Sequence, residues 1–137
     1  MIAIDTTILV AARRRELPMH TAAFAAVKRL AEGATPWALP SPCLAEFLRV
    51  VTHPRLFSPP ATPPAAMKFL HDLLLSPTAR LLFPKDRFLT IFEDLVVNSK
   101  VTGNLIFDAQ IAAICIESGV SQILTEDRDF HRFQQLT

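Results

Sequence analysis

Short apolar segments alternate with stretches of helical periodicity along the chain, and this alternation restricts the possible folds more than any other feature. Each apolar segment has the length of one buried strand and is bounded by polar or turn-forming residues. The expected strands are residues 2–4, 37–39, 80–83 and 120–125. Strands separated by helices form βαβ units, which require parallel strands and right-handed crossovers. The sequence therefore predicts an α/β fold with a central parallel sheet and helices on both faces.

The helical segments have recognisable starts and stops. We expect helices over residues 20–31, 42–51, 65–75, from residue 86 onward, and over residues 107–118. Ser41 before a proline and Thr62 before two prolines are typical N-caps, and Gly119 is a typical stop. The five prolines between residues 52 and 64 predict a loop. The last helix is apolar on nearly every side, so we expect it to be buried.

Composition excludes several classes of protein. Half of the 137 residues are hydrophobic and the net charge is +1, which favours one folded domain over residues 1–137 and argues against disorder. No apolar run approaches the roughly 18 residues of a membrane span. The N-terminus lacks a basic segment and carries Asp5, so it does not resemble a secretory signal, and we expect a cytoplasmic protein. Cys43 and Cys115 have no metal-ligand spacing and are expected to be buried thiols.

Acidic residues follow strands or begin helices at several distant positions. Asp5 follows the first expected strand, Asp127 and Asp129 follow the last one, and Asp108 opens the buried helix. Ligands of open parallel sheets bind outside the carboxyl ends of the strands. Because strand ends and helix starts meet at one edge of such a sheet, we expect these acids to converge there.

Each acid also has a simpler interpretation. Asp108 is suited to the first turn of any helix, where the helix dipole favours a negative charge. Asp127 and Asp129 are common turn formers, and Glu46 fits a solvated helix position. The apolar neighbours of Glu46, Leu44-Ala45 and Phe47-Leu48, argue against simple exposure. The hypothesis of one shared acidic site depends on these residues lying at the same edge of the sheet.

Clustered carboxylates repel one another unless a hard cation with oxygen ligands lies between them. We therefore expect Mg²⁺, with Mn²⁺ as a possible substitute. A metal ion of this kind supports phosphoryl chemistry, so hydrolysis of a phosphodiester is the expected reaction. Arginines and lysines elsewhere on the surface are candidates for phosphate contacts. These are Arg13, Arg14, Arg15, Arg49, Arg55, Lys85, Arg87, Arg128 and Arg132.

Other chemistries fit the sequence poorly. The three glycines form no glycine-rich turn after the first strand, which excludes a dinucleotide-binding fingerprint and a P-loop. A phosphatase of the haloacid dehalogenase type would need an acid at position 7, which is threonine. A response-regulator receiver would need a phosphoacceptor aspartate after its third strand. The four histidines are scattered and are assigned no role.

Four blocks of sequence resemble the PIN-domain ribonucleases, and within them the VapC toxins of bacterial toxin–antitoxin pairs. The resemblance runs nearly end to end and is most specific in the last block. The blocks are Ile4-Asp5-Thr6-Thr7, Ala45-Glu46-Phe47-Leu48-Arg49-Val50-Val51-Thr52, Gly103-Asn104-Leu105-Ile106-Phe107-Asp108-Ala109 and Thr125-Glu126-Asp127-Arg128-Asp129-Phe130.

The resemblance implies a catalytic site made of Asp5, Glu46, Asp108 and Asp127. Asp5, Asp108 and Asp127 would bind the metal ion, with Asp5 and Asp108 as the foremost direct ligands. Polar neighbours would support them, namely Thr6, Ser41, Asn104, Thr125 and Asp129. The sequence departs from the family pattern at Thr7, where Asn or Ser is frequent, and at Phe107, where a polar residue is common. Phe107 cannot donate a hydrogen bond, which would slow activity or shift substrate choice.

The resemblance also implies partners. An RNA substrate, a VapB-type antitoxin and a homodimer are expected, with no membrane association. The expected activity is Mg²⁺-dependent endonucleolytic cleavage of RNA by a toxin. The alternative is a PIN-like module that binds RNA or protein and has little or no nuclease turnover. Cleavage of RNA with and without Mg²⁺ separates the two.

Overall fold

Four parallel strands form the central sheet of the computed structural model, which describes residues 1–137. They are β1 (Ile2–Ile4), β2 (Trp37–Pro40), β3 (Ala79–Leu82) and β4 (Gln122–Leu124), in the spatial order β3-β2-β1-β4. The register pairs Ile4 with Leu124 and Ala3 with Ala38. All four predicted strands are confirmed, and none of their ends is shifted by more than two residues. The order reverses at β1, so the carboxyl end of β1 lies at the switch point of the sheet.

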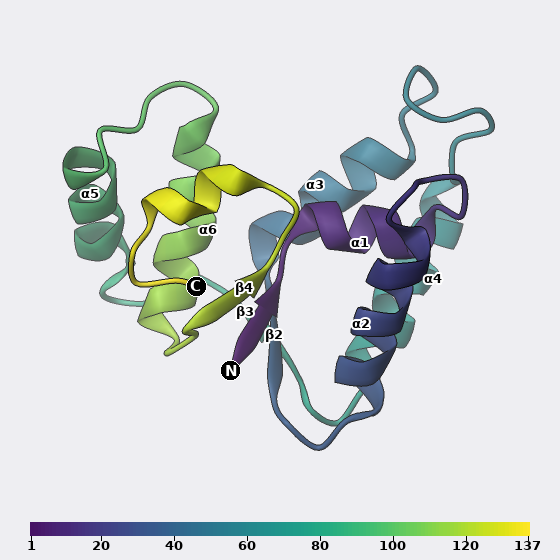
Figure 1. Ribbon diagram of the computed structural model, residues 1–137, viewed down its shortest axis with the longest axis horizontal. Helices are drawn as coiled ribbons and strands as arrows, with labels where there is room; N and C mark the ends of the chain where they lie inside the picture. The colour runs from purple at the N-terminus through teal and green to yellow at the C-terminus, as the bar shows by residue number, and fades with distance from the viewer.

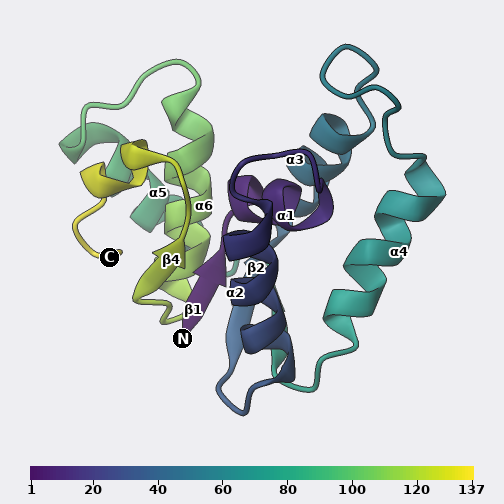
Figure 2. The same ribbon diagram turned by 45° about the vertical axis from the view of Figure 1, so that its right-hand side comes forward.

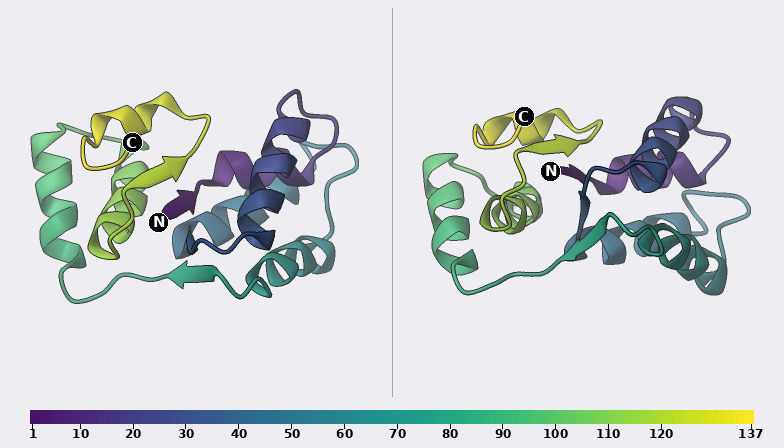
Figure 3. Two further views of the ribbon diagram at one scale, coloured as in Figure 1. Left: turned by 60° about the horizontal axis from the view of Figure 1, so that its bottom comes forward. Right: turned by 90° about the horizontal axis from the view of Figure 1, so that it is seen from below.

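Helices cover both faces of the sheet, as the sequence predicts. Figure 3 shows α5 and α6 on one side of the strands and α1, α2, α3 and α4 on the other. Their bounds are α1 (Thr6–Arg13), α2 (His20–Glu32), α3 (Ser41–Val51), α4 (Pro63–Leu74), α5 (Phe88–Asn98) and α6 (Leu105–Glu117), followed by a short 3₁₀ helix, η1 (Arg128–Arg132). None of these helices combines the length and the apolar character that crossing a bilayer requires.

Helix α1 is the element that the sequence analysis did not predict. It begins directly after β1, and its first residues, Thr6, Thr7 and Ile8, are β-branched and favour a strand. Asp5 occupies the N-cap position, but its side chain makes no capping hydrogen bond. The helix is stabilised instead by burial, since Leu9 and most of its other residues are buried. Tertiary packing therefore overrides local propensity here.

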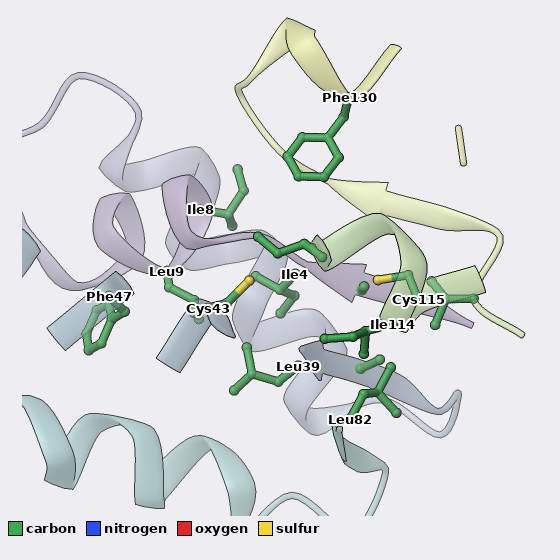
Figure 4. Packing of buried hydrophobic residues seen from close by; sticks show 14 of the residues in the cluster. Ile4, Ile8, Leu9, Leu39, Cys43, Phe47, Leu82, Ile114, Cys115 and Phe130 are labelled. Carbon is green, nitrogen blue, oxygen red and sulfur yellow. The ribbon is translucent and has the colours of Figure 1, made fainter. Parts of the chain in front are cut away.

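Helix α6 crosses the centre of the other face and is buried, as expected. In Figure 4 its Ile114 and Cys115 point toward Ile4 and Leu39 on the sheet. Ile114 and Cys115 are completely inaccessible to solvent. Gly119 ends the helix region with φ +76°, a left-handed conformation that glycine adopts without strain. The packing of this helix against the sheet fixes the position of its first turn, which carries Asp108, relative to the sheet edge.

A long loop over residues 52–62 joins α3 to α4, as the prolines predict (Figure 2). Arg14 holds this loop, because its Nη2 donates to the Pro59 carbonyl at 2.9 Å and its guanidinium lies 4.3 Å from the centre of the Phe57 ring. Arg14 is buried and paired with Glu16. The expectation that Arg14 contacts phosphates is therefore wrong, since its donors are used inside the fold.

Two N-cap predictions have different outcomes. Thr62 caps α4, and its hydroxyl accepts a hydrogen bond from the Ala65 amide at 3.3 Å. Ser41 does not cap α3, because the helix starts one residue earlier than predicted and Pro40 takes the cap position. Proline leaves the first turn without a side-chain acceptor, so the predicted cap at Ser41 is wrong.

Candidate metal centre

Asp5 lies at the carboxyl end of β1, where the strand passes directly into α1 (Figure 1). Its backbone amide continues the ladder and donates to the Leu124 carbonyl at 3.0 Å. The side chain is only 4% exposed. Because a buried carboxylate needs hydrogen-bond donors, its partners decide where its oxygens point.

Two threonine hydroxyls hold one oxygen of Asp5. Thr125 Oγ1 donates to Asp5 Oδ2 at 2.7 Å, and Thr7 Oγ1 donates to the same oxygen at 3.0 Å. Each hydroxyl also accepts a hydrogen bond from a backbone amide. The Asp127 amide donates to the Thr125 hydroxyl, and the Glu126 amide donates to the Thr7 hydroxyl. Every proton of this network then has one acceptor. The two hydroxyls thus join the end of β1 to the turn after β4.

The other oxygen of Asp5 lies near a buried thiol. Cys43 Sγ is 3.9 Å from Asp5 Oδ1 and is completely buried. Burial, and next the negative charge of Asp5, raise the pKa of this thiol well above its usual 9.0. Cys43 therefore remains protonated and acts as a weak donor. The predicted burial of Cys43 and Cys115 is confirmed, while the contact with Asp5 was not foreseen.

Glu46 projects from α3 and is held by the first turn of α1. Thr6 Oγ1 donates to Glu46 Oε2 at 2.8 Å across 40 residues of sequence. Thr6 is buried, whereas Glu46 is partly exposed. The interpretation of Glu46 as a freely solvated helix residue is therefore wrong.

Three aspartates form the tightest carboxylate group. One carboxylate oxygen from each of Asp108, Asp127 and Asp129 lies within 4.8 Å of the others. Asp108 comes from the first turn of α6, and the other two come from the turn after β4 and from η1. Asp127 also caps η1, with Oδ1 accepting from the Asp129 amide at 2.8 Å. The turn-forming role and the cluster thus coexist at Asp127.

The electrostatics of Asp108 reflect this crowding. Burial is the largest cause that raises its pKa from 3.8 to about 7. The negative charges of Asp127, Asp5, Glu46 and Asp129 follow in that order. All the acids predicted from the sequence therefore act on one carboxyl group. No arginine or lysine lies close enough to balance them through an ion pair, apart from Arg132, whose Nε is 3.8 Å from Asp129.

Two hollows adjoin the acids. The first has a volume of about 420 Å³ and is lined by Asp5, Glu46, Asp108 and Asp127 together with apolar residues of α1 and the α1–α2 connection. The second has a volume of about 720 Å³ and shares Glu46, Asp108 and Asp127 with the first. Asn104 and Asp129 line the second hollow, and Ser41 lines neither.

The donor set fits a hard divalent cation. Asp108, Asp127 and Asp129 offer only oxygen ligands within a space small enough for one ion to touch all three. Burial and the neighbouring acids both raise the pKa of Asp108, and no basic side chain forms an ion pair with it. A cation would relieve that repulsion, so the residues present suit a metal ion. Thr7, which stands where Asn or Ser is frequent in the family, donates a hydrogen bond to Asp5.

Comparison with known proteins agrees with this geometry. The PIN domain model matches residues 2–136. The chain is 37% identical over 136 residues to ribonuclease VapC43 of Mycobacterium tuberculosis, covering 99% of this chain and 92% of that protein. It is 32% identical over 130 residues to ribonuclease VapC48 of the same organism, covering 95% and 90%.

Solved structures have the same fold at lower identity. VapBC2 from Rickettsia felis, bound to a DNA fragment from its promoter, matches with a TM-score of 0.71 at 20% identity, covering 99% of this chain and 96% of that chain. VapC20 of Mycobacterium tuberculosis, a sarcin-ricin loop cleaving toxin, matches with a TM-score of 0.69 at 19% identity, covering 96% and 93%. The chain therefore belongs to the PIN domain family and, within it, to the VapC ribonucleases.

Proposed function

We propose that this protein hydrolyses phosphodiester bonds of RNA in its acidic site, with Mg²⁺ as the cofactor and Mn²⁺ as a possible substitute. One observation carries the proposal, namely that carboxylate oxygens of Asp108, Asp127 and Asp129 lie within 4.8 Å of one another. Burial, and next the negative charges of four other acids, raise the pKa of Asp108 to about 7. Such crowding disfavours the charged state in the metal-free protein. This arrangement at the open edge of the sheet supports the proposal that a cation binds there.

The protein residues divide the remaining work among them. Asp108, Asp127 and Asp129 would hold the ion, and Asp5 would face it with its position fixed by Thr125 and Thr7. When bound, a divalent ion offsets charge on the phosphate oxygens and lowers the pKa of a water molecule. Glu46, oriented by Thr6, would act as the general base that accepts a proton from an attacking water.

RNA is the proposed substrate because proteins similar to this chain are named ribonucleases. VapC43 and VapC48 are named ribonucleases, and VapC20 is described as a toxin that cleaves the sarcin-ricin loop. An RNA-cleaving toxin acts in the cytoplasm, so we place this protein there. The net charge of +1 does not oppose RNA binding, because the acids of the site account for much of the negative charge.

Cleavage of RNA by the purified, partner-free protein tests the proposal. The wild type should cut RNA with Mg²⁺ or Mn²⁺ and not in EDTA, while Ca²⁺ should bind and support little turnover, since it accepts looser geometry. Asp108→Asn should abolish cutting. Asp86→Asn is the matched control, because Asp86 is exposed and lines neither hollow. Wild-type rates in Asp108→Asn would refute the site.

RNA binding without cleavage by the wild type would instead support the alternative of a PIN-like binding module. For this alternative, the RNA should still bind to the protein when Mg²⁺ is present, and it should be recovered uncut. A module of this kind would use the acids to hold an ion without turnover.

We propose a VapB-type antitoxin as the protein partner and a homodimer as the toxin's own assembly. The VapBC2 complex of Rickettsia felis motivates the first part. A basic side chain from the partner could pair with the exposed carboxylates and displace the metal ion. Co-purification of this protein with a co-expressed protein encoded next to it would support the proposed toxin–antitoxin pair. Light scattering that reports a monomer at micromolar concentration, with no stable partner, would contradict it.

A further inference from the structure

The second hollow contains groups that the metal centre does not use. Besides the shared acids it is lined by Arg49, Asn104, Phe107 and Gln110. Arg49 comes from α3, and the other three come from the start of α6. The hollow is therefore lined by residues of two helices together with the carboxylates.

Phe107 is an exposed aromatic residue directly beside the acids. Its relative exposure is 61%, although the rest of α6 is largely buried. It pairs with no other ring in the structure. An aromatic face of this kind is not needed by the core, and it adjoins Asp108 in sequence. It is free to contact a planar ligand that occupies the hollow.

Arg49 is the one basic residue that lines either hollow. It lies one helical turn after Glu46, so both residues project from the same side of α3. Arg49 is exposed and forms no ion pair. Its guanidinium is therefore available for a phosphate, and it is the only basic side chain that attracts a polyanion among the carboxylates that line the hollow.

The first hollow differs in character. Its wall away from the acids is apolar, formed by Val10, Leu17, Met19 and neighbours, and it contains no basic residue. A phosphate entering there would meet carboxylates without any cationic partner. The backbone of a bound nucleic acid is therefore favoured on the side of Arg49.

We infer that Phe107 and Arg49 form a nucleotide subsite beside the metal centre. Phe107 stacks on an unpaired base, and Arg49 binds the phosphate attached to that nucleotide. The inference rests on the proposed ribonuclease function and specifies its substrate as single-stranded RNA at the cleavage position, because only an unpaired base exposes its face for stacking. Phe107 and Arg49 are then specificity-determining residues.

Steady-state cleavage and direct binding of one single-stranded oligoribonucleotide test the inference together. Phe107→Leu should raise KM and weaken binding in Ca²⁺ about tenfold, with a smaller effect on kcat, since a base–aromatic contact is lost. Phe107→Trp should restore both values. Phe83→Leu is the matched control, because Phe83 is similarly exposed and lines neither hollow.

Two further measurements locate the contacts. Arg49→Gln should reduce the slope of log binding constant against log salt by about 0.7, the value for one phosphate of a single strand. An abasic ribose at one nucleotide next to the cleaved bond should weaken wild-type binding as much as Phe107→Leu does. The same abasic substrate should cost the Phe107→Leu variant nothing further, because the stacking partner is already absent.

The outcomes separate this inference from the proposed function. If the wild type cleaves RNA and Phe107→Leu matches it in KM and binding, the subsite is overturned and the ribonuclease stands. If RNA binds in Ca²⁺ with the predicted dependence on Phe107 but is never cleaved in Mg²⁺, the subsite stands and the ribonuclease fails. Weaker binding of a protein partner by Phe107→Leu, with unchanged RNA binding, also overturns the subsite.

Discussion

Replacing Asp108 by asparagine should stabilise the metal-free protein while destroying its activity. The carboxyl group has a pKa raised from 3.8 to about 7 by burial and by four neighbouring acids. Asparagine keeps the size and polarity of the side chain and removes its charge. The variant therefore relieves the repulsion that a metal ion would otherwise balance.

The sign of the pH dependence follows from the raised pKa. Below about pH 4 the carboxyl is protonated in both the folded and the unfolded chain, so it costs no stability. Between about pH 4 and pH 7 the folded state retains a proton that the unfolded state has lost. Stability is lost as pH rises through this window, and the full penalty is present above it.

The size of the penalty is bounded by the structure. A rise from 3.8 to about 7 corresponds to about 4 kcal/mol at 1.36 kcal/mol per unit, which we discount to about 2 kcal/mol because the side chain is partly exposed and screened by solvent. For a chain of this length, 2 kcal/mol shifts the melting temperature by about 7 °C. This difference is well within the reach of calorimetry.

Melting in EDTA at a series of pH values measures the effect. The difference between Asp108→Asn and wild type should grow from near zero at pH 4 to its full value at pH 8. Asp86→Asn should show no comparable gain, since Asp86 lies outside the acid cluster. A variant that is no more stable than wild type at pH 8, or a difference that does not change with pH, would refute the reasoning.

Three further predictions follow from the same contacts. Thr125→Val should lower the free energy of unfolding by about 1 to 3 kcal/mol and reduce kcat, because buried Asp5 loses its shortest hydrogen bond. Thr125→Ser keeps the hydroxyl, so it should retain both values in melting and cleavage assays. Cys43 and Cys115 should react with a thiol reagent at pH 8 only after denaturation. Burial raises the pKa of both thiols, that of Cys115 to about 12. Rapid labelling of the native protein would contradict this prediction. Arg14→Leu should lower stability by about 1 to 3 kcal/mol through lost contacts with the 52–62 loop and leave RNA affinity unchanged, as measured by melting and by binding.

The overall architecture could be predicted from periodicity and turn residues, because each signal is local. The alternation of strands and helices gives the parallel sheet, and the switch-point rule then places Asp5, Asp108 and Asp127 at one edge. Helix α1 was not predictable in this way. Its sequence favours a strand locally, and only packing against α2 and α3 makes it helical.

The composition of the site was only partly predictable. The family resemblance put Asp5 and Asp108 foremost among the ligands, whereas the tightest group of oxygens belongs to Asp108, Asp127 and Asp129. The difference arises because Thr7 and Thr125 occupy one oxygen of Asp5, and the bond from Thr125 joins residues 120 positions apart, which leaves no local pattern. The contact of Cys43 with Asp5 is equally invisible in the sequence, since a buried cysteine in a helix usually indicates only packing.

Binding of Mn²⁺, followed by the loss of its free signal in electron paramagnetic resonance, tests most directly whether distant acids form one metal centre. The wild type should bind Mn²⁺ saturably, and Mg²⁺ should compete for the same site. Asp108→Asn and Asp127→Asn should each weaken binding at least about tenfold, because each removes one charged ligand from the shared site. Asp86→Asn should bind as wild type does. Unchanged affinity in Asp108→Asn, or an equal loss in Asp86→Asn, would contradict the account.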